Sequence, residues 1–333
     1  MKIAILDDYQ NATPGLECYG LLAGHEVKVF NNTTRGLGQL AIRLAPYDAL
    51  VLIRERTAFH RALLAKLPNL KLISQTGKVS GHVDVAACTE LGIAIAEGVG
   101  SPTAPAELTW ALIMAAARKI VPYAANLKDG LWQTASINPA LNGLGFVLKG
   151  RTLGIWGYGK IGRMVAGYGR AFGMQVLVWG GEASRQAAQA DGHAAADSRE
   201  AFFEQADVLS LHLRLHDSTR GVVTAEDLAR MKPDALFVNT SRAELVQENA
   251  LEEALQRGRP GHAALDVFTN EPLAADSPLL RIPTVLATPH LGYVERDSYE
   301  LYFKHAFQNV ADFAAGRCKT ILNPEYAQHP RQE

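Results

Sequence analysis

Three polar residues each stand just after a short apolar run in the last third of the sequence: Arg242, Glu271 and His290. A histidine titrates near neutral pH and can exchange a proton with a substrate oxygen. A carboxylate on its second ring nitrogen fixes the tautomer and stabilises the imidazolium, and an arginine binds a carboxylate through its planar fork. Taken singly, such residues are more often solvated charges or structural histidines. Their shared position after predicted strands favours one site that reduces a carbonyl group and protonates its oxygen.

A glycine-rich segment opens the second half of the chain. The apolar run 153–156 leads directly into Gly157-Tyr158-Gly159-Lys160-Ile161-Gly162, and a helical pattern follows. Gly157 permits a tight turn, Gly159 lets the backbone approach a pyrophosphate, and Gly162 lets the helix pack closely on the strand. The N-terminus of that helix attracts the anion. The strand before the glycines and the helix after them favour a dinucleotide site over an ordinary strand-to-helix turn.

The residues that distinguish NAD from NADP are expected roughly twenty positions later, at the end of the next strand. The acid that would bind the ribose 2′-hydroxyl of NAD is missing there, because Gly180 and Gly181 occupy the place and Glu182 is displaced. Ser184 and Arg185 follow, and both side chains can bind a 2′-phosphate. The cofactor is therefore NAD or NADP, with NADP slightly favoured, since Arg185 alone is equally typical of a solvated helix residue.

The sequence around these motifs alternates apolar runs with amphipathic stretches, as in parallel sheets covered by helices. In the first hundred residues the expected strands are 3–6, 27–30, 49–53, 70–74 and 93–96. In the second half they are 153–156, 175–179, 208–213, 236–239, 263–267 and 285–287. We therefore expect an α/β protein with two doubly wound parallel-sheet domains, which also suits a length of 333 residues.

Two longer helical patterns are expected to join these domains. One runs from Ala106 towards Leu127, and the other runs from Glu295 to just before Gly316. The chain then returns to the first domain, which is discontinuous (1–100 and 291–333) around a dinucleotide-binding domain of residues 101–290. The segment 129–150 is rich in Gly, Asn and Pro, which is typical of a loop or arm.

Composition excludes several classes of protein. Lys and Arg together number 33 and Asp and Glu 34, so the net charge of -1 excludes a nucleic-acid or membrane-surface partner. No run of 18 apolar residues predicts a membrane-spanning helix. Three scattered cysteines argue against a disulfide framework and a metal site. The expectation is a cytoplasmic protein that holds no metal and binds a small molecule.

In these motifs the sequence resembles the D-isomer-specific 2-hydroxyacid dehydrogenases. The resemblance spans nearly the whole chain and is strongest at 157–162, 239–242, 266–272 and 289–292. It implies a Rossmann cofactor domain, a flavodoxin-like substrate domain and a homodimer. It also implies that Arg242 binds the substrate carboxylate and keto oxygen, that His290 is the acid/base, and that Glu271 pairs with His290. Formate dehydrogenases of the same superfamily carry glutamine opposite the histidine, so Glu271 argues against that activity.

The same resemblance implies further site residues. Asp266 is expected to contact the nicotinamide amide. In the first domain, backbone N–H groups around Gly77, Lys78 and Val79 are expected to bind the substrate carboxylate, and Arg54 is a further pocket residue. The remaining cofactor contacts are expected from Tyr158, Lys160, Ile161, His212, Thr240 and Ser241.

Two residues leave alternatives open. Lys78 replaces a small or apolar residue of the family pattern, and its charge either favours a more acidic substrate or points to solvent. Trp132 resembles an arm residue that reaches the partner subunit's site in some relatives, or it packs within its own loop.

The expected activity is reversible, NAD(P)-dependent reduction of a 2-keto acid to a D-2-hydroxy acid, with reduction favoured at neutral pH because His290 begins protonated. The alternative is a dinucleotide-sensing regulatory protein of the same fold with little turnover. Such regulators keep all three polar residues, so these do not discriminate, whereas the short tail after Pro324 favours the enzyme. Pocket shape rather than motif selects the keto acid, so its identity is not predicted.

Overall fold

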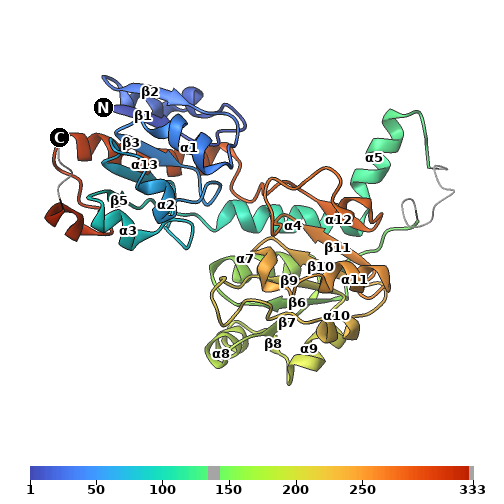
Figure 1. Cartoon of the computed structure of the whole chain (residues 1–333). Coiled ribbons are helices and arrows are strands. Elements are labelled where there is room, and N and C mark those ends of the chain that lie inside the picture. The colour runs from blue at the N-terminus through green and yellow to red at the C-terminus, as the bar shows by residue number, and fades with distance from the viewer. Residues whose placement is uncertain (134–142, 330–333) are drawn as a thin grey trace. The chain divides into compact units, whose positions relative to one another are not determined.

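The computed structural model describes residues 1–133 and 143–329, and it divides into two compact units that each contain one parallel sheet (Figure 1). The first unit contains Met1–Ser101 and Glu295–Glu333, and the second contains Pro102–Val294. Part of the predicted arm at 129–150, namely 134–142, lies outside the described residues. No helix among the described residues is long and apolar enough to cross a membrane.

The sheet of the first unit has five parallel strands in the order β2-β1-β3-β4-β5. This is the flavodoxin-like order, in which the chain reverses direction across the sheet between β1 and β3. Residues of the central strands β3 and β4 are buried on both faces, which explains their continuous apolar sequence. All five predicted strands are confirmed within three residues at their ends. They are β1 (Lys2–Ile5), β2 (Glu26–Val29), β3 (Ala49–Leu52), β4 (Leu72–Gln75) and β5 (Ala94–Ala96).

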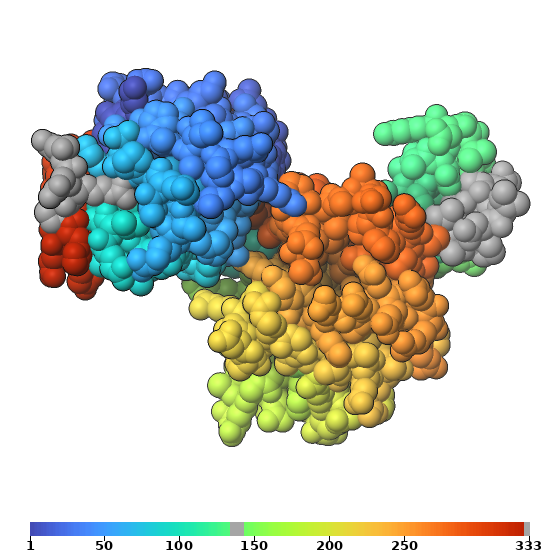
Figure 2. Space-filling model, in the orientation of Figure 1, coloured from blue at the N-terminus to red at the C-terminus, as the bar shows by residue number. Residues whose placement is uncertain are grey.

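The long C-terminal helix α13 (Arg296–Ala314) belongs to the first unit. Glu295 caps it by accepting hydrogen bonds from the N–H groups of its first turn. Phe303 and Phe307 are buried in its packing face, and the chain beyond the helix returns beside the end of β5, where Figure 2 shows the red C-terminal segment beside cyan residues. The other helices of this unit are α1 (Leu37–Leu44), α2 (Arg61–Leu64), α3 (Val85–Glu90) and the 3₁₀ helices η1 (Thr13–Gly15), η2 (Glu17–Leu22) and η4 (Pro324–Gln328).

The sheet of the second unit has seven parallel strands in the order β12-β11-β10-β9-β6-β7-β8. Six of them form the Rossmann order, and β12 extends the edge. The six predicted strands are confirmed, whereas β8 was not predicted because two residues are too few for a periodic pattern. The strands are β6 (Thr152–Trp156), β7 (Gln175–Trp179), β8 (Ala194–Ala195), β9 (Val208–Leu211), β10 (Leu236–Asn239), β11 (His262–Leu265) and β12 (Val285–Ala287).

The expected helical pattern from Ala106 towards Leu127 is divided into two helices. Lys119 adopts a left-handed conformation (φ 50°), which interrupts the helical hydrogen bonds between α4 (Thr103–Ala117) and α5 (Ile120–Lys128). Leu112 and Ile113 of α4 are buried in the core of the second unit. The remaining helices of this unit are α7 (Lys160–Ala171), α8 (Glu182–Ala190), α9 (Arg199–Gln205), α10 (Ala225–Arg230), α11 (Ala250–Gln256), α12 (Pro278–Arg281) and the 3₁₀ helix η3 (Ala243–Leu245).

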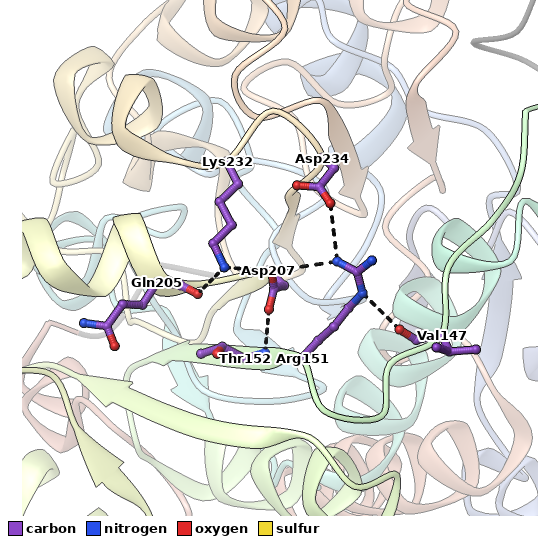
Figure 3. A network of polar contacts seen from close by, with 7 residues as sticks. All are labelled: Val147, Arg151, Thr152, Gln205, Asp207, Lys232 and Asp234. Carbon is purple, nitrogen blue, oxygen red and sulfur yellow. Dashed lines mark hydrogen bonds and ion pairs between the residues drawn. The ribbon is translucent and has the colours of Figure 1, made fainter.

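A polar network fastens the amino-terminal edge of the second sheet (Figure 3). Asp207 accepts a 2.7 Å hydrogen bond from the N–H of Thr152, the first residue of β6. The same carboxylate lies 2.8 Å from the Lys232 Nζ and 3.8 Å from the Arg151 guanidinium. The Asp207 side chain is only 14% exposed, so solvent screens these ion pairs less than it screens surface pairs. They stabilise the edge opposite to the one where parallel sheets bind ligands.

Candidate active site

The three predicted catalytic residues follow β10, β11 and β12, three neighbouring strands whose carboxyl ends lie at one edge of the sheet. His290 Nδ1 lies 2.7 Å from Glu271 Oε2. The other oxygen of Glu271 accepts a 2.9 Å hydrogen bond from the Phe268 N–H. The structure thus brings His290 and Glu271 together as a pair, and the positive charge of Arg242 acts on Glu271.

The charge state of Glu271 follows from this arrangement. Burial raises the pKa of Glu271, but the hydrogen bond and charge of His290, the Phe268 N–H and the Arg242 charge together bring it below its usual value. Glu271 is therefore a carboxylate at neutral pH and accepts the proton on Nδ1 of His290. Nε2 is then the ring nitrogen of His290 that remains for proton exchange with a substrate.

The backbone at His290 is held in an unusual conformation. Its φ of 53° lies in the left-handed region, which costs energy for a residue other than glycine and occurs most often at functional sites. Asp266 fixes the residues on both sides: it accepts hydrogen bonds from Thr288 Oγ1 (2.6 Å) and from the N–H groups of Leu291 (2.7 Å) and Gly292 (2.9 Å). The loop thus presents the imidazole in one orientation.

Asp266 itself is fully buried. Burial raises the pKa of Asp266, although the Thr288 hydroxyl, the two N–H groups and the charge of His290 oppose the rise. Both carboxylate oxygens bind the His290 loop, so the structure assigns Asp266 a positioning role, and its contact with a nicotinamide stays a prediction. Tyr293 was not predicted: its ring meets the imidazole of His290 edge-on at 5.6 Å, and its nearness in sequence was the only signal.

The loop that carries Arg242 is fixed by Asn239, the last residue of β10. Asn239 accepts a hydrogen bond from the Ser241 N–H (3.0 Å) and donates one to the Arg242 carbonyl oxygen (2.8 Å). The Arg242 Nη1 bonds the Ser241 carbonyl oxygen at 2.7 Å, and the Thr240 hydroxyl lies 2.7 Å from that of Thr109 on α4. These bonds order the loop, and the cofactor contacts of Thr240 and Ser241 stay predictions.

The glycine motif has the geometry that a pyrophosphate requires. A Cβ on Gly162 would lie 2.1 Å from the carbonyl oxygen of Gly157, and one on Gly157 would lie 2.6 Å from that of His212. Gly157 also has a φ of 101°, which favours glycine. Gly159 precedes α7 without a side-chain cap, and a Cβ there would meet nothing within 4 Å. The open N-terminus of α7 therefore offers backbone N–H groups to an anion.

The other residues of the motif contribute through their backbone. The Tyr158 side chain is buried and donates a 2.9 Å hydrogen bond to Asp191. Burial and this bond raise the pKa of Tyr158 to about 12. Ile161 packs against the core of the second unit, and Lys160 is exposed at the first turn of α7. We therefore restrict the predicted cofactor contacts of Tyr158 and Ile161 to their main-chain atoms.

The end of β7 bears on the choice of coenzyme. The Arg185 guanidinium lies over the ring of Trp179, 5.2 Å from its centroid, so Arg185 extends back towards the strand end. Its Nε is buried without a hydrogen-bond partner. Ser184 lies beside Gly180, whereas Glu182 turns to Gln186 and accepts a 2.9 Å hydrogen bond. The strand end therefore presents a cation and a hydroxyl in place of an acid.

His212 provides a pH-dependent term in stability. Burial lowers the pKa of His212 from 6.5 to about 4, and its Nε2 lies 3.0 Å from the Ser210 hydroxyl. The unfolded chain binds this proton below pH 6.5 and the folded chain does not, so folding weakens as the pH falls from 6.5 towards 4. Between pH 7.5 and 5 the loss is about 2 kcal/mol. In His212→Asn, urea unfolding at both pH values should show a loss smaller by about that amount; an unchanged loss would contradict this assignment.

The predicted substrate loop lies in the first unit. Arg54 Nη1 packs against Gly77, where a Cβ would lie 2.1 Å away, and Arg54 has a φ of 53°. The Val79 N–H donates a 2.8 Å hydrogen bond to Glu97 Oε1, and Lys78 Nζ lies 2.7 Å from Glu97 Oε2. Lys78 is exposed but paired, a state that neither alternative for it included. Glu97 was not predicted, and its one signal is an acid directly after an apolar strand.

Trp132 is 68% exposed. The alternative that its ring packs within its own loop is therefore wrong for the residues that the structure describes. A contact between Trp132 and a partner subunit stays a prediction.

Comparisons with known proteins agree with this arrangement. Residues 110–292 match the model of the family described as D-isomer specific 2-hydroxyacid dehydrogenase, NAD binding domain. The chain is 37% identical over 258 residues to the glyoxylate reductase of Aeropyrum pernix, which covers 77% of this chain and 76% of that one.

Two crystal structures are closely similar. An oxidoreductase from Ralstonia solanacearum is 60% identical with a TM-score of 0.94, and the match covers 98% of each chain. A phosphoglycerate oxidoreductase from Vibrio cholerae is 57% identical with a TM-score of 0.92, and the match covers 95% of this chain and 99% of the other.

Proposed function

Because this chain belongs to the D-isomer-specific 2-hydroxyacid dehydrogenase family, we propose that it reduces a 2-keto acid to the D-2-hydroxy acid with NADH or NADPH. Membership makes it an oxidoreductase with a nicotinamide dinucleotide cofactor. The proposal adds the residue roles, the D configuration of the product and a slight preference for NADP. The observation that carries it is the 2.7 Å pair of His290 and Glu271 at the carboxyl edge of a Rossmann sheet.

The residues have complementary tasks in this reaction. The open N-terminus of α7 and the glycines before it hold the pyrophosphate of the dinucleotide. When bound, the reduced nicotinamide supplies hydride. Arg242 binds the carboxylate and polarises the keto oxygen of the substrate. His290 gives the proton on Nε2 to that oxygen while Glu271, ionised at neutral pH, stabilises the imidazolium before the transfer. The substrate carbon gains a hydride and its oxygen gains a proton, which balances the reduction.

Substrate anchoring is the task proposed for the first unit. Gly77, Lys78 and Val79 supply N–H groups to the carboxylate, and Arg54 places a guanidinium against the same loop. Because Glu97 already accepts the Val79 hydrogen bond, the N–H groups beside it are the more accessible donors. We also propose a homodimer, as the family resemblance implies, which light scattering of the eluted protein tests.

The activity is tested by following the oxidation of NADH and of NADPH with glyoxylate, hydroxypyruvate, pyruvate, phenylpyruvate and 2-ketoglutarate. Turnover of one or more of these acids to the D-hydroxy acid supports the proposal. Tight binding of the dinucleotide without turnover of any acid would overturn it and favour the sensing protein of the same fold.

The coenzyme preference is tested separately at Arg185. In Arg185→Gln the KM for NADPH should rise about 10- to 100-fold, the effect of losing one charge-assisted hydrogen bond to a 2′-phosphate. The KM for NADH should change little, because the 2′-hydroxyl carries no charge. Arg170→Gln, an exposed arginine on α7, is the matched control and should leave both values unchanged. An equal rise for both coenzymes would exclude a 2′-phosphate contact.

A further inference from the structure

An acidic side chain is built into the predicted substrate loop. Glu97 follows β5 directly, and its two carboxylate oxygens bind different groups of the loop. Oε1 accepts the N–H of Val79 at 2.8 Å, and Oε2 lies 2.7 Å from Nζ of Lys78. The loop is therefore held by a carboxylate of the protein itself, and the charge of Lys78 is matched by a charge of opposite sign.

The position of Glu97 is fixed by several elements of the first unit. Its N–H donates to the Thr320 carbonyl oxygen (3.4 Å), and its carbonyl oxygen accepts from Asn309 Nδ2 of α13 (3.1 Å). The Glu97 side chain is 16% exposed, whereas in the surface pair of Arg61 and Glu90 both side chains are more than half exposed. A carboxylate that is anchored in this way and mostly buried keeps its place when a ligand arrives, and solvent screens its charge weakly.

We propose that Glu97 restricts this site to 2-keto acids that carry a single negative charge. The inference rests on the proposed function, in which the loop binds the substrate carboxylate. Arg54 lies against Gly77 and provides a cation for that carboxylate. Lys78 would attract a second acidic group of the substrate, but Glu97 cancels its charge and repels such a group. Glyoxylate, pyruvate and hydroxypyruvate fit this charge pattern, and keto acids with a second carboxylate, a phosphate or a sulfonate do not.

The test compares two substrates that differ in one charged group: pyruvate, with a methyl group, and ketomalonate, with a carboxylate in its place. The measured quantity is the ratio of kcat/KM for ketomalonate to kcat/KM for pyruvate. Glu97→Gln removes the charge and keeps an oxygen that accepts the Val79 N–H. This variant should raise the ratio about 5- to 10-fold, the effect of one charge a few ångströms away near a protein surface.

Two further variants make the expected pattern specific. Lys78→Met leaves the charge of Glu97 unmatched and should lower the ratio by a similar factor. The double variant Lys78→Met with Glu97→Gln removes both charges and should return the ratio to about the wild-type value. Glu90→Gln, the same change at the surface ion pair with Arg61, is the matched control and should not alter the ratio.

The outcomes separate this inference from the proposed function. If the wild type reduces no 2-keto acid, the proposed function fails, and this inference fails with it. If the wild type reduces pyruvate but Glu97→Gln leaves the ratio unchanged, the inference alone is wrong. A purely structural role for Glu97 gives that second result, because a disordered loop impairs both substrates equally.

Discussion

His290→Asn should lower kcat/KM for 2-keto acid reduction by about 10³-fold, within the usual range for loss of a general acid. Asparagine is the informative replacement, because His290 has a φ of 53° and asparagine tolerates the left-handed conformation better than other residues that lack an acidic proton. The loop held by Asp266 then keeps its shape, and the loss reports the chemistry of the imidazole. Steady-state oxidation of the reduced coenzyme at saturating dinucleotide measures it.

Two measurements protect this interpretation. The dissociation constant of the dinucleotide, from quenching of protein fluorescence, should remain within about 2-fold of the wild-type value, since His290 is not expected to bind the cofactor. His262→Asn is the matched control: His262 begins β11 at the opposite edge of the same sheet, so its loss should leave kcat/KM unchanged. Activity of His290→Asn near the wild-type level would remove His290 from the mechanism and leave Glu271 without a catalytic role.

The sequence predicted the catalytic pair because it depends on a general property of parallel sheets. The carboxyl ends of neighbouring strands lie at one edge, so polar residues that follow those strands come close together whatever the length of the intervening chain. Glu271 and His290 are 19 positions apart and meet at 2.7 Å for this reason. The same reasoning predicted the order of both sheets, since apolar runs of four or five residues mark buried strands clearly.

The parts that were missed depend on contacts that no local pattern encodes. Glu97 binds a loop 18 positions earlier in the chain, and only the packing of β5 beside β4 brings the two together. Asp266 reaches the N–H groups of residues 25 and 26 positions later. The division between α4 and α5 at Lys119 reflects one residue's φ, which helix propensity does not predict. Sequence therefore predicts which residues act, and tertiary contacts decide what holds them.

The dinucleotide site should be equally sensitive to a single methyl group. In Gly162→Ala the new Cβ would lie 2.1 Å from the carbonyl oxygen of Gly157, a backbone atom that cannot turn aside. The first turn of α7 must then move away from the end of β6, which displaces the N–H groups that bind the pyrophosphate. We expect the dissociation constants of NADH and NADPH to rise at least about 100-fold, the loss of two or three charge-assisted hydrogen bonds.

The matched control lies five positions later on the same helix. Gly167 is exposed, and a Cβ there would meet nothing within 4 Å. Gly167→Ala should bind both coenzymes normally and raise the free energy of unfolding by roughly 0.5–1 kcal/mol, the usual gain for alanine over glycine inside a helix. Isothermal titration and urea unfolding of the two variants separate binding from stability. If Gly162→Ala were folded and bound either coenzyme with wild-type affinity, the glycine motif would not be the pyrophosphate site.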